Sequence, residues 1–249
     1  MSHPLAIVLA AGQGTRMDTD LPKVLVPVLG RPMVRYVVDA LREAEIEDIV
    51  LVVGYRADEV RAELADEPGL RFVEQEEQLG TGHAVMMARE MLANHEGPVV
   101  IVTGDSPLTQ SSSLRAMVDT FANGETACLL GTAYKDVPAG LGRILRDNEG
   151  GFVGIVEEKD ASEAERRITE VNMSTYVFAA ADLLDVLDSL TRNNAQAEYY
   201  ITDGPGILKG SGRVVRAVPV LKPCEALSIN TLDELAAVED EMRQIQEDR

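Results

Sequence analysis

The fold is decided by the stretch Leu5-Ala6-Ile7-Val8-Leu9-Ala10-Ala11-Gly12-Gln13-Gly14-Thr15-Arg16-Met17. Its first part, Leu5–Ala10, is an apolar run that predicts a short buried strand. Gly12 and Gly14 can take positive φ and turn successive backbone N–H groups toward an anion. Ala10, Ala11 and Gly12 carry so little side chain that a planar base or a ribose can lie against the main chain. A strand that ends in such a loop has the outline of a nucleotide cradle.

Two basic residues follow the glycine loop. Arg16 offers a planar fork of donors for phosphate oxygens, and Lys23 offers a mobile point charge. A Walker A loop is excluded because no Gly-Lys-Ser/Thr follows Gly12, and a dinucleotide fingerprint is excluded because Met17 replaces its third glycine. Taken alone, the glycine turn fits a tight strand-to-helix connection with a solvated arginine equally well.

The composition is that of an ordinary globular protein with an acidic balance. The 249 residues are 45% hydrophobic and 26% charged, and the formal net charge is −19 at pH 7. This charge disfavours nucleic acids and anionic membrane surfaces as partners. Cys128 and Cys224 match neither a metal spacing nor a disulfide framework. The N-terminus lacks a basic region and its apolar run is too short for a secretory or membrane segment, so we expect a cytoplasmic enzyme.

The first half of the chain alternates between strand and helix patterns. We expect helices at residues 32–44, 56–65, 82–94 and 112–122, between strands at residues 5–10, 49–53, 70–73, 99–102 and 127–132. This alternation predicts right-handed crossovers and an α/β fold, a Rossmann-like, mostly parallel sheet with helices on both faces.

The rhythm changes after residue 132. The sequence predicts a hairpin from residues 143–146 and 151–156, strands at 171–179 and 213–220, and a helix at 183–190. Residues 231–234 resemble a capping box that opens a charged C-terminal helix. We therefore expect a single domain over residues 1–249 with a mixed sheet. Its parts are a nucleotide-binding half (about 1–132), an acceptor-side, partly antiparallel half (133–230) and the C-terminal helix (231–249).

Two oxygen-bearing side chains are candidate metal ligands. Asp105 follows the apolar run Val99-Val100-Ile101-Val102-Thr103-Gly104, at the sheet edge where ligands of open α/β sheets collect. Its carboxylate suits a Mg²⁺ ion held between protein and phosphates. Asn230 precedes the last helix and could supply a second, neutral oxygen. A turn-capping Asp and a helix-flanking Asn are the alternatives, and the two residues form a metal pair only if the fold brings them together.

Polar runs elsewhere are open to two interpretations. Gln75 and the run Gln78-Leu79-Gly80-Thr81-Gly82-His83-Ala84 could read the imide edge of uracil, or could simply lead into a capped helix. We assign His83 no ligand role. Glu157 could bind a sugar hydroxyl and Lys159 a phosphate, or both could belong to a solvated charge run. Asn172 and residues 193–203 carry the same ambiguity between reading a sugar and closing turns.

Taken together, these stretches resemble the sugar-nucleotide pyrophosphorylases, most closely the uridylyltransferase domains of bacterial N-acetylglucosamine-1-phosphate uridylyltransferases. The resemblance covers nearly the whole chain, in family order. It is carried by residues 9–17, 21–25, 78–84, 104–108, 140–144, 155–161, 170–172 and 193–203. It implies a Rossmann-like mixed sheet, a sugar-binding second half and transfer of UMP from UTP to a sugar-1-phosphate with Mg²⁺.

The resemblance also implies roles for individual residues. Catalytic roles fall to Arg16, Lys23 and Asp105, the first two holding the triphosphate and the third sharing the magnesium ion with Asn230. The implied nucleotide-binding residues are Gln75, Gly80 and Thr81 with the main chain of Ala11 and Gly12. From the same stretches we add Leu9, Ala10, Gly14 and Gln78 as nucleotide-binding candidates. The implied sugar-binding residues are Gly142, Glu157 and Asn172, and we add Lys159 to them as the candidate phosphate ligand named above.

Three features depart from the family pattern. Met173-Ser174 follows Asn172 where the family commonly shows Thr-Gly, and Glu158 stands where histidine is frequent. Bifunctional members continue into a β-helix that acetylates the sugar, whereas this sequence stops at Arg249, so we expect no acetyltransferase activity unless the sequence is a shortened form. The alternatives to uridylyl transfer are guanylyl or cytidylyl transfer to another phosphorylated molecule, and a non-catalytic nucleotide-sugar sensor. The oligomeric state stays open.

Overall fold

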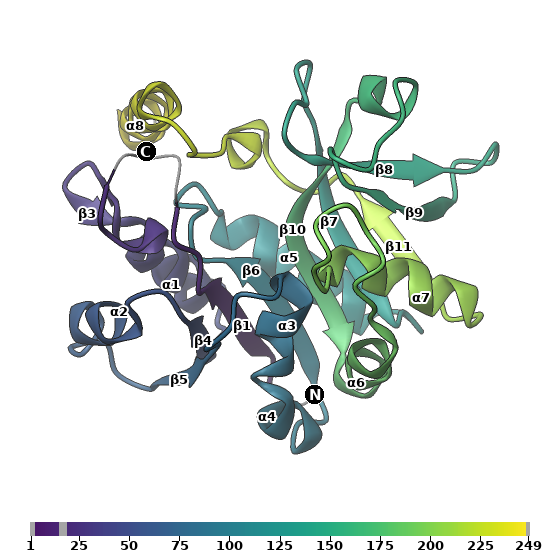
Figure 1. Ribbon diagram of the computed structural model, residues 1–249, viewed down its shortest axis with the longest axis horizontal. Coiled ribbons are helices and arrows are strands. Elements are labelled where there is room, and N and C mark those ends of the chain that lie inside the picture. Colours follow the sequence, from purple (N-terminus) through teal and green to yellow (C-terminus); the bar gives the residue numbers. More distant parts are fainter. Residues whose placement is uncertain (1–2, 15–18, 248–249) are drawn as a thin grey trace.

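The computed structural model describes residues 3–14 and 19–247 and is centred on one mixed β-sheet (Figure 1). The strands of its main path run in the order β11-β7-β10-β6-β1-β4-β5. They are β1 (Leu5–Ala10), β4 (Asp48–Val53), β5 (Leu70–Glu74), β6 (Pro98–Thr103), β7 (Cys128–Tyr134), β10 (Glu170–Ala179) and β11 (Val215–Val218). β10 is antiparallel to β6 and β7, and the other pairs on this path are parallel. The prediction of a mixed, mostly parallel sheet is confirmed.

Helices cover both faces of this sheet, as predicted. Strand β1 is buried throughout because its alternate side chains enter two different cores. The helices are α1 (Met33–Glu43), α2 (Ala57–Glu63), α3 (Thr81–Met86), α4 (Arg89–Ala93), α5 (Ser111–Ala122), α6 (Ala180–Ser189), α7 (Gly204–Gly210) and α8 (Leu232–Glu247). Ala6 and Val8 pack in the core that includes α1, α2 and α5, and Leu5 and Ile7 pack in the core that includes α3, α4 and α6.

The second half of the chain extends the same sheet. The predicted hairpin is formed by β8 (Gly142–Arg146) and β9 (Phe152–Val156), and β8 pairs with the start of β10. The register of β10 against β7 shifts between Asn172 and Thr175, so this strand carries an irregularity beside the hairpin. Because β10 and β11 join strands of the first half, the two predicted halves share one sheet.

Two elements differ from the prediction. The helix expected at residues 82–94 is divided into α3 and α4, because the turn at Met87 and Ala88 tightens to hydrogen bonds with residues three positions earlier. The short helix α7 was not predicted, since its glycines have low helix propensity and its proline lies at the first turn, where it costs little.

The C-terminal helix α8 covers a small third core rather than the main sheet. This core includes Val26, Val28, Leu108, Ile229 and Val238, and α8 lies against the hairpin of β2 (Pro27–Val28) and β3 (Arg31–Pro32). The predicted capping box is present, with the reciprocal hydrogen bonds between residues 231 and 234. No helix in the described part of the chain is long and apolar enough to cross a membrane.

Candidate active site

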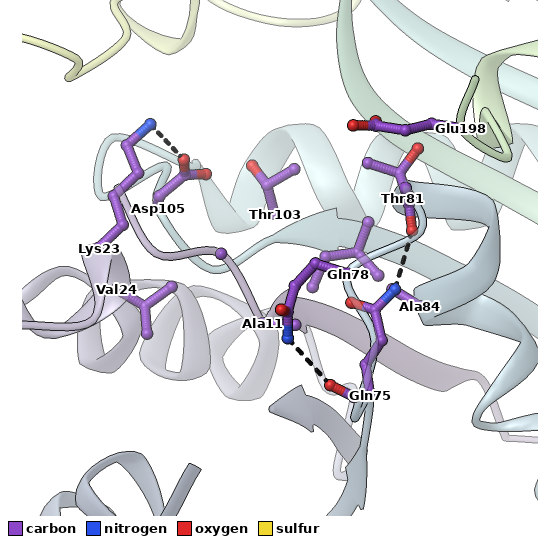
Figure 2. Close-up of a pocket in the computed structure, with 13 residues that line it drawn as sticks. Ala11, Lys23, Val24, Gln75, Gln78, Thr81, Ala84, Thr103, Asp105 and Glu198 are labelled. Carbon is purple, nitrogen blue, oxygen red and sulfur yellow. Dashed lines mark hydrogen bonds and ion pairs between the residues drawn. The ribbon is translucent and has the colours of Figure 1, made fainter. Parts of the chain in front are cut away.

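A cavity of about 260 Å³ opens at the carboxyl ends of β1 and β6 (Figure 2). Ligands of open α/β sheets bind at this edge because the backbone and the loops there leave a crevice. Its lining residues are Leu9, Ala11, Gly12, Lys23, Val24, Gln75, Gln78, Gly80, Thr81, Ala84, Thr103, Asp105 and Glu198. Most of the predicted nucleotide-binding residues therefore face one cavity.

At one end of the cavity, three predicted site residues meet. Lys23 Nζ lies 2.6 Å from Asp105 Oδ2 and donates a hydrogen bond of 3.1 Å to Asn230 Oδ1. The side chains of Lys23 and Asp105 are 17% and 27% exposed, so the ion pair is accessible from the cavity yet partly shielded. The structure thus brings the carboxylate and the amide oxygen within reach of one cationic nitrogen. We call this group the Lys23 junction.

The third hydrophobic core holds the segments of this junction together. Lys23 begins the 3₁₀ turn η1 (Lys23–Leu25), and Val26 just after it is buried in this core. Leu108, three residues after Asp105, and Ile229, next to Asn230, are buried in the same core. Three stretches that are far apart in the sequence are therefore fixed relative to one another by apolar packing.

The glycine loop passes beside Lys23. Gly14 has φ +68°, and a Cβ there would lie 2.7 Å from Lys23 Cβ, so both its conformation and its contact require glycine. We expected a positive φ at both Gly12 and Gly14, but Gly12 does not have one. A Cβ added at Gly12 would meet no described atom within 4 Å. Its missing side chain therefore leaves open space in the cavity wall. Arg16 lies outside the described residues.

Gln75 is held on the opposite side of the cavity by its neighbours. It is 3% exposed, its Nε2 donates to Gly80 O at 3.0 Å, and the same nitrogen lies 3.0 Å from His83 Nδ1. Gln78 Nε2 in turn donates to Gln75 O at 3.1 Å. Figure 2 shows the Gln75 amide nitrogen directed at the Gly80–Thr81 turn and its oxygen on the other side. His83, for which we expected no ligand role, therefore helps to orient Gln75.

The turn at Gly80 is locked onto a second predicted stretch. Gly80 has φ +106°, and a Cβ there would lie 2.5 Å from Tyr199 O. Gly82 N donates to that carbonyl at 2.8 Å, and Ile201 N donates to Thr81 Oγ1 at 3.1 Å. These contacts bring Glu198 into the cavity wall, close to Thr81 in Figure 2.

Three of the predicted sugar-binding residues form a separate group that we call the Glu157 group. A Cβ on Gly142 would lie 3.5 Å from both Asn172 Cβ and Glu157 Oε1, so the three are neighbours. Asn172 is 4% exposed and its Nδ2 donates to the buried Tyr176 hydroxyl at 2.8 Å. Lys159, the fourth candidate, is exposed in the turn after β9. The structure brings Gly142, Glu157 and Asn172 together and leaves Lys159 at the surface.

Burial perturbs the titration of the carboxylates near this group. Burial raises the pKa of Glu157, an effect partly offset by its hydrogen bond to Thr202. Burial, with the charge of Asp160, also raises the pKa of Asp203. Burial and the same acidic surroundings raise the pKa of Tyr200 to about 12. The region therefore disfavours additional negative charge.

Both sequence departures near the Glu157 group have structural accounts. Glu158 Oε2 lies 2.6 Å from Nη2 of Arg143, which is 1% exposed, and this hydrogen bond lowers the pKa of Glu158. A glutamate at this position therefore neutralises a buried guanidinium. Ser174 has φ +52°, a left-handed conformation that favours glycine, which is the residue common in the resembled family.

Four lining residues were missed as site residues from the sequence, of which Val24 and Ala84 are apolar and Thr103 and Glu198 are polar. Thr103 ends β6, and its hydroxyl lies 2.7 Å from the Ser106 hydroxyl. The position of Thr103 at the carboxyl end of a predicted strand could have identified it as a site residue. Glu198 was quoted only within a run of amides, and its role depends on the pairing of its segment with a turn about 120 residues earlier. No local pattern shows such a pairing.

A solved structure shares this fold. A crystal structure of a "Putative Glucose-1-Phosphate Thymidylyltransferase" from Bacillus anthracis matches it with a TM-score of 0.78, covering 96% of this chain and 95% of that one. At 20% identity this likeness shows the fold alone. The family follows from the sequence, because the model of the MobA-like NTP transferase domain matches residues 6–202. The chain belongs to this nucleotidyltransferase family.

Curated relatives are similar along almost the whole chain. It is 44% identical to the bifunctional protein GlmU of Geobacillus sp. strain WCH70 over 239 residues. This aligned region covers 96% of this chain and 52% of the relative. It is 45% identical over 242 residues to the bifunctional protein GlmU of Lactococcus lactis strain SK11, which covers 97% and 52%. The chain thus spans about half the length of the curated relatives it matches.

Proposed function

We propose that the chain transfers UMP from UTP to a sugar-1-phosphate and releases pyrophosphate. The acceptor that we propose is N-acetylglucosamine-1-phosphate. The observation that carries this proposal is the Lys23 junction at the mouth of the cavity, where Lys23 Nζ contacts both Asp105 Oδ2 and Asn230 Oδ1. A cationic end beside a glycine loop suits a triphosphate, and the Gln75–Gly80 side suits a base. The similarity to bifunctional GlmU proteins supports the same reaction.

The junction also fits a divalent cation. Its two oxygens already converge on one positive charge, and a carboxylate with an amide oxygen is a hard-oxygen donor set that suits Mg²⁺. No cluster of three His, Cys, Asp or Glu suited to a metal occurs within residues 3–14 and 19–247. Mg²⁺ commonly uses one or two carboxylates and completes its shell with phosphate and water. Asp105 and Asn230 would hold the ion, which would neutralise phosphate charge.

The chemistry then needs alignment rather than proton transfer. The attacking oxygen of a sugar-1-phosphate is already an anion, so no general base is required. It attacks the α-phosphorus in line, the new O–P bond forms, and the bond to the pyrophosphate oxygen breaks. The obstacle is the repulsion between two polyanions, which Lys23, displaced from Asp105 onto phosphate, would reduce. Arg16, whose side chain is not described, would share this role.

The acceptor would lie against the Glu157 group. Glu157 and Asn172 offer a carboxylate and an amide to sugar hydroxyls, and Gly142 lets them pack closely, since a Cβ there would lie 3.1 Å from Ile155 Cγ2. The raised pKa values of Glu157 and Asp203 favour hydroxyl donors over a second anion at this place.

We also propose that the protein acts in the cytoplasm and that its partners are these small-molecule substrates.

The test is a pyrophosphate-release assay with Mg²⁺. UTP, GTP, CTP and ATP are compared with N-acetylglucosamine-1-phosphate as acceptor, followed by glucose-1-phosphate and glucosamine-1-phosphate with the preferred nucleotide. We expect release with UTP and N-acetylglucosamine-1-phosphate that stops when EDTA removes the metal. Preference for GTP or CTP would replace the uridylyl assignment. Tight binding of a UDP-sugar without turnover would identify a sensor instead.

A further inference from the structure

A buried carboxylate without a catalytic assignment joins the two oxygen-bearing segments of the Lys23 junction. Glu225 belongs to the 3₁₀ turn η4 (Pro223–Ala226), five residues before Asn230, and is 8% exposed. Its Oε1 accepts from Gln110 N at 3.1 Å, and its Oε2 accepts from Ser113 Oγ at 2.5 Å and Lys222 N at 2.8 Å. These donors are two backbone amides and a hydroxyl, so three neutral groups partly offset the burial that raises the pKa of this carboxylate.

Two of those donors belong to the segment that carries Asp105. Gln110 immediately precedes helix α5 and Ser113 lies in its first turn, and hydrogen bonds also brace the loop from Asp105 to this helix. Thr109 N donates to Ser106 O at 3.1 Å, its hydroxyl donates to the same oxygen at 2.8 Å, and the Ser106 hydroxyl meets Thr103. These contacts fix the loop that carries Asp105 against the start of α5.

The segment that carries Asn230 is similarly constrained on its other side. Glu234 Oε2 accepts from Asn230 N at 2.6 Å, and Ile229 is buried in the third core together with Leu108. Lys135 Nζ donates to Ala226 O at 2.9 Å, which anchors the residue after Glu225. Glu225 thus adds a polar tie between two segments that the third core also packs together.

We infer that Glu225 is a positioning residue that sets the separation of Asp105 and Asn230, and hence the affinity of the junction for a divalent cation in the nucleotide complex. The inference rests on the proposed function, since it concerns the metal that would accompany the triphosphate. An effect on metal affinity distinguishes Glu225 from a carboxylate that only stabilises the fold. A purely structural residue would change stability while leaving the metal dependence as it is.

The experiment compares Glu225→Ala with Glu67→Ala. Glu67 is a matched control because its largely buried carboxylate ties α1 to the end of α2 through Arg35 and Arg42, with no contact to the junction. The first readout is the Mn²⁺ dissociation constant in the presence of UTP, measured from free Mn²⁺ by electron paramagnetic resonance. The second is the Mg²⁺ concentration at half-maximal pyrophosphate release, and thermal unfolding is recorded for every variant.

We expect Glu225→Ala to weaken Mn²⁺ binding about tenfold and to raise the half-maximal Mg²⁺ concentration similarly, whereas Glu67→Ala changes only stability. Should Glu225→Ala not fold, Ser113→Ala removes one contact of the carboxylate and should give a two- to threefold effect. Glu225→Gln should restore part of the affinity. In an Asn230→Ala background, Glu225→Gln should have no further effect on Mn²⁺ binding, because without the Asn230 oxygen the separation that Glu225 sets no longer affects the metal.

The failures of the two proposals are distinguishable. Unchanged Mn²⁺ affinity in Glu225→Ala, or additive effects of Glu225→Gln and Asn230→Ala, would overturn the positioning role while wild-type turnover persists. Absence of pyrophosphate release by the wild type with every nucleotide would instead remove the proposed function.

Discussion

The Lys23 junction and the Glu157 group lie in one molecule but satisfy their polar atoms differently. At the junction, three segments present a lysine, a carboxylate and an amide that contact one another and are partly exposed toward a cavity. In the Glu157 group, polar side chains are buried and use neutral neighbours, with Asn172 donating to Tyr176 and Glu157 bonded to Thr202. A ligand at the first region exchanges one charge contact for another. A ligand at the second must replace internal hydrogen bonds.

This difference leads to an expectation about mutations. Substitutions at the junction should reduce turnover with little change in stability, because its apolar support lies in the third core beneath it. Substitutions in the Glu157 group and in the locked Gly80 turn should change stability and substrate affinity together.

The largest effect should come from the junction itself. Lys23→Ala and Asp105→Ala should each lower turnover by roughly a hundredfold or more, since one positioned electrostatic contact contributes about 2.7–4 kcal/mol at comparable sites. Steady-state pyrophosphate release checks this, and Lys209→Ala, an exposed lysine on α7, is the control. Near-normal turnover of either variant would mean that the roles are wrongly assigned.

Two glycines in the same cavity sharpen the comparison. Gly80→Ala should destabilise the protein by about 1–3 kcal/mol, because φ is +106° and the new Cβ meets the Tyr199 carbonyl. Gly12→Ala should leave stability within about 0.5 kcal/mol and raise the KM for UTP about tenfold, because its Cβ extends into open cavity space. Thermal unfolding and KM are measured on both. Equal stability losses in the two variants would contradict this account.

Glu157→Gln should separate stability from acceptor binding. Burial raises the pKa of Glu157 in the folded state, so the folded protein holds this proton more tightly and loses stability as the pH rises through that pKa. The glutamine variant should therefore melt higher than the wild type at pH 7.5, with the gap closing as the pH falls. Its KM for the sugar-1-phosphate should rise about tenfold, because a charge-assisted hydrogen bond is lost.

The control for this pH series is Glu163→Gln, an exposed glutamate for which we expect no such gap. A Glu157→Gln melting temperature below the wild-type value at pH 7.5 would show that the carboxylate is stabilising there.

The smallest effect concerns the irregularity in β10. Ser174→Gly should raise the free energy of unfolding by less than about 1 kcal/mol, because relief of the left-handed conformation is partly cancelled by the greater entropy of the unfolded chain. Chemical denaturation measures this change. A loss of stability would indicate that the serine side chain contributes contacts beyond its backbone strain.

The sequence was most informative where residues close in the chain decide the structure. The alternating apolar runs predicted the sheet and its two helical layers, and the capping box at residues 231–234 is present. The division of the expected helix into α3 and α4 at Met87 and Ala88 could not be predicted, since nothing in the helical pattern indicates a tightened turn. The position of Glu198 in the cavity wall depends on contacts between segments that are distant in the sequence. The same holds for the contacts of Lys23 with Asp105 and Asn230, so no local pattern predicts them.

The most direct test of the central claim is diffraction from crystals grown with Mn²⁺ and UTP, with the metal located by its anomalous signal. The account predicts a manganese peak about 2–2.3 Å from both Asp105 and Asn230 oxygens, with Lys23 Nζ moved onto a phosphate oxygen. A peak elsewhere, with Lys23 still bridging Asp105 and Asn230 while UTP fills the cavity, would contradict it.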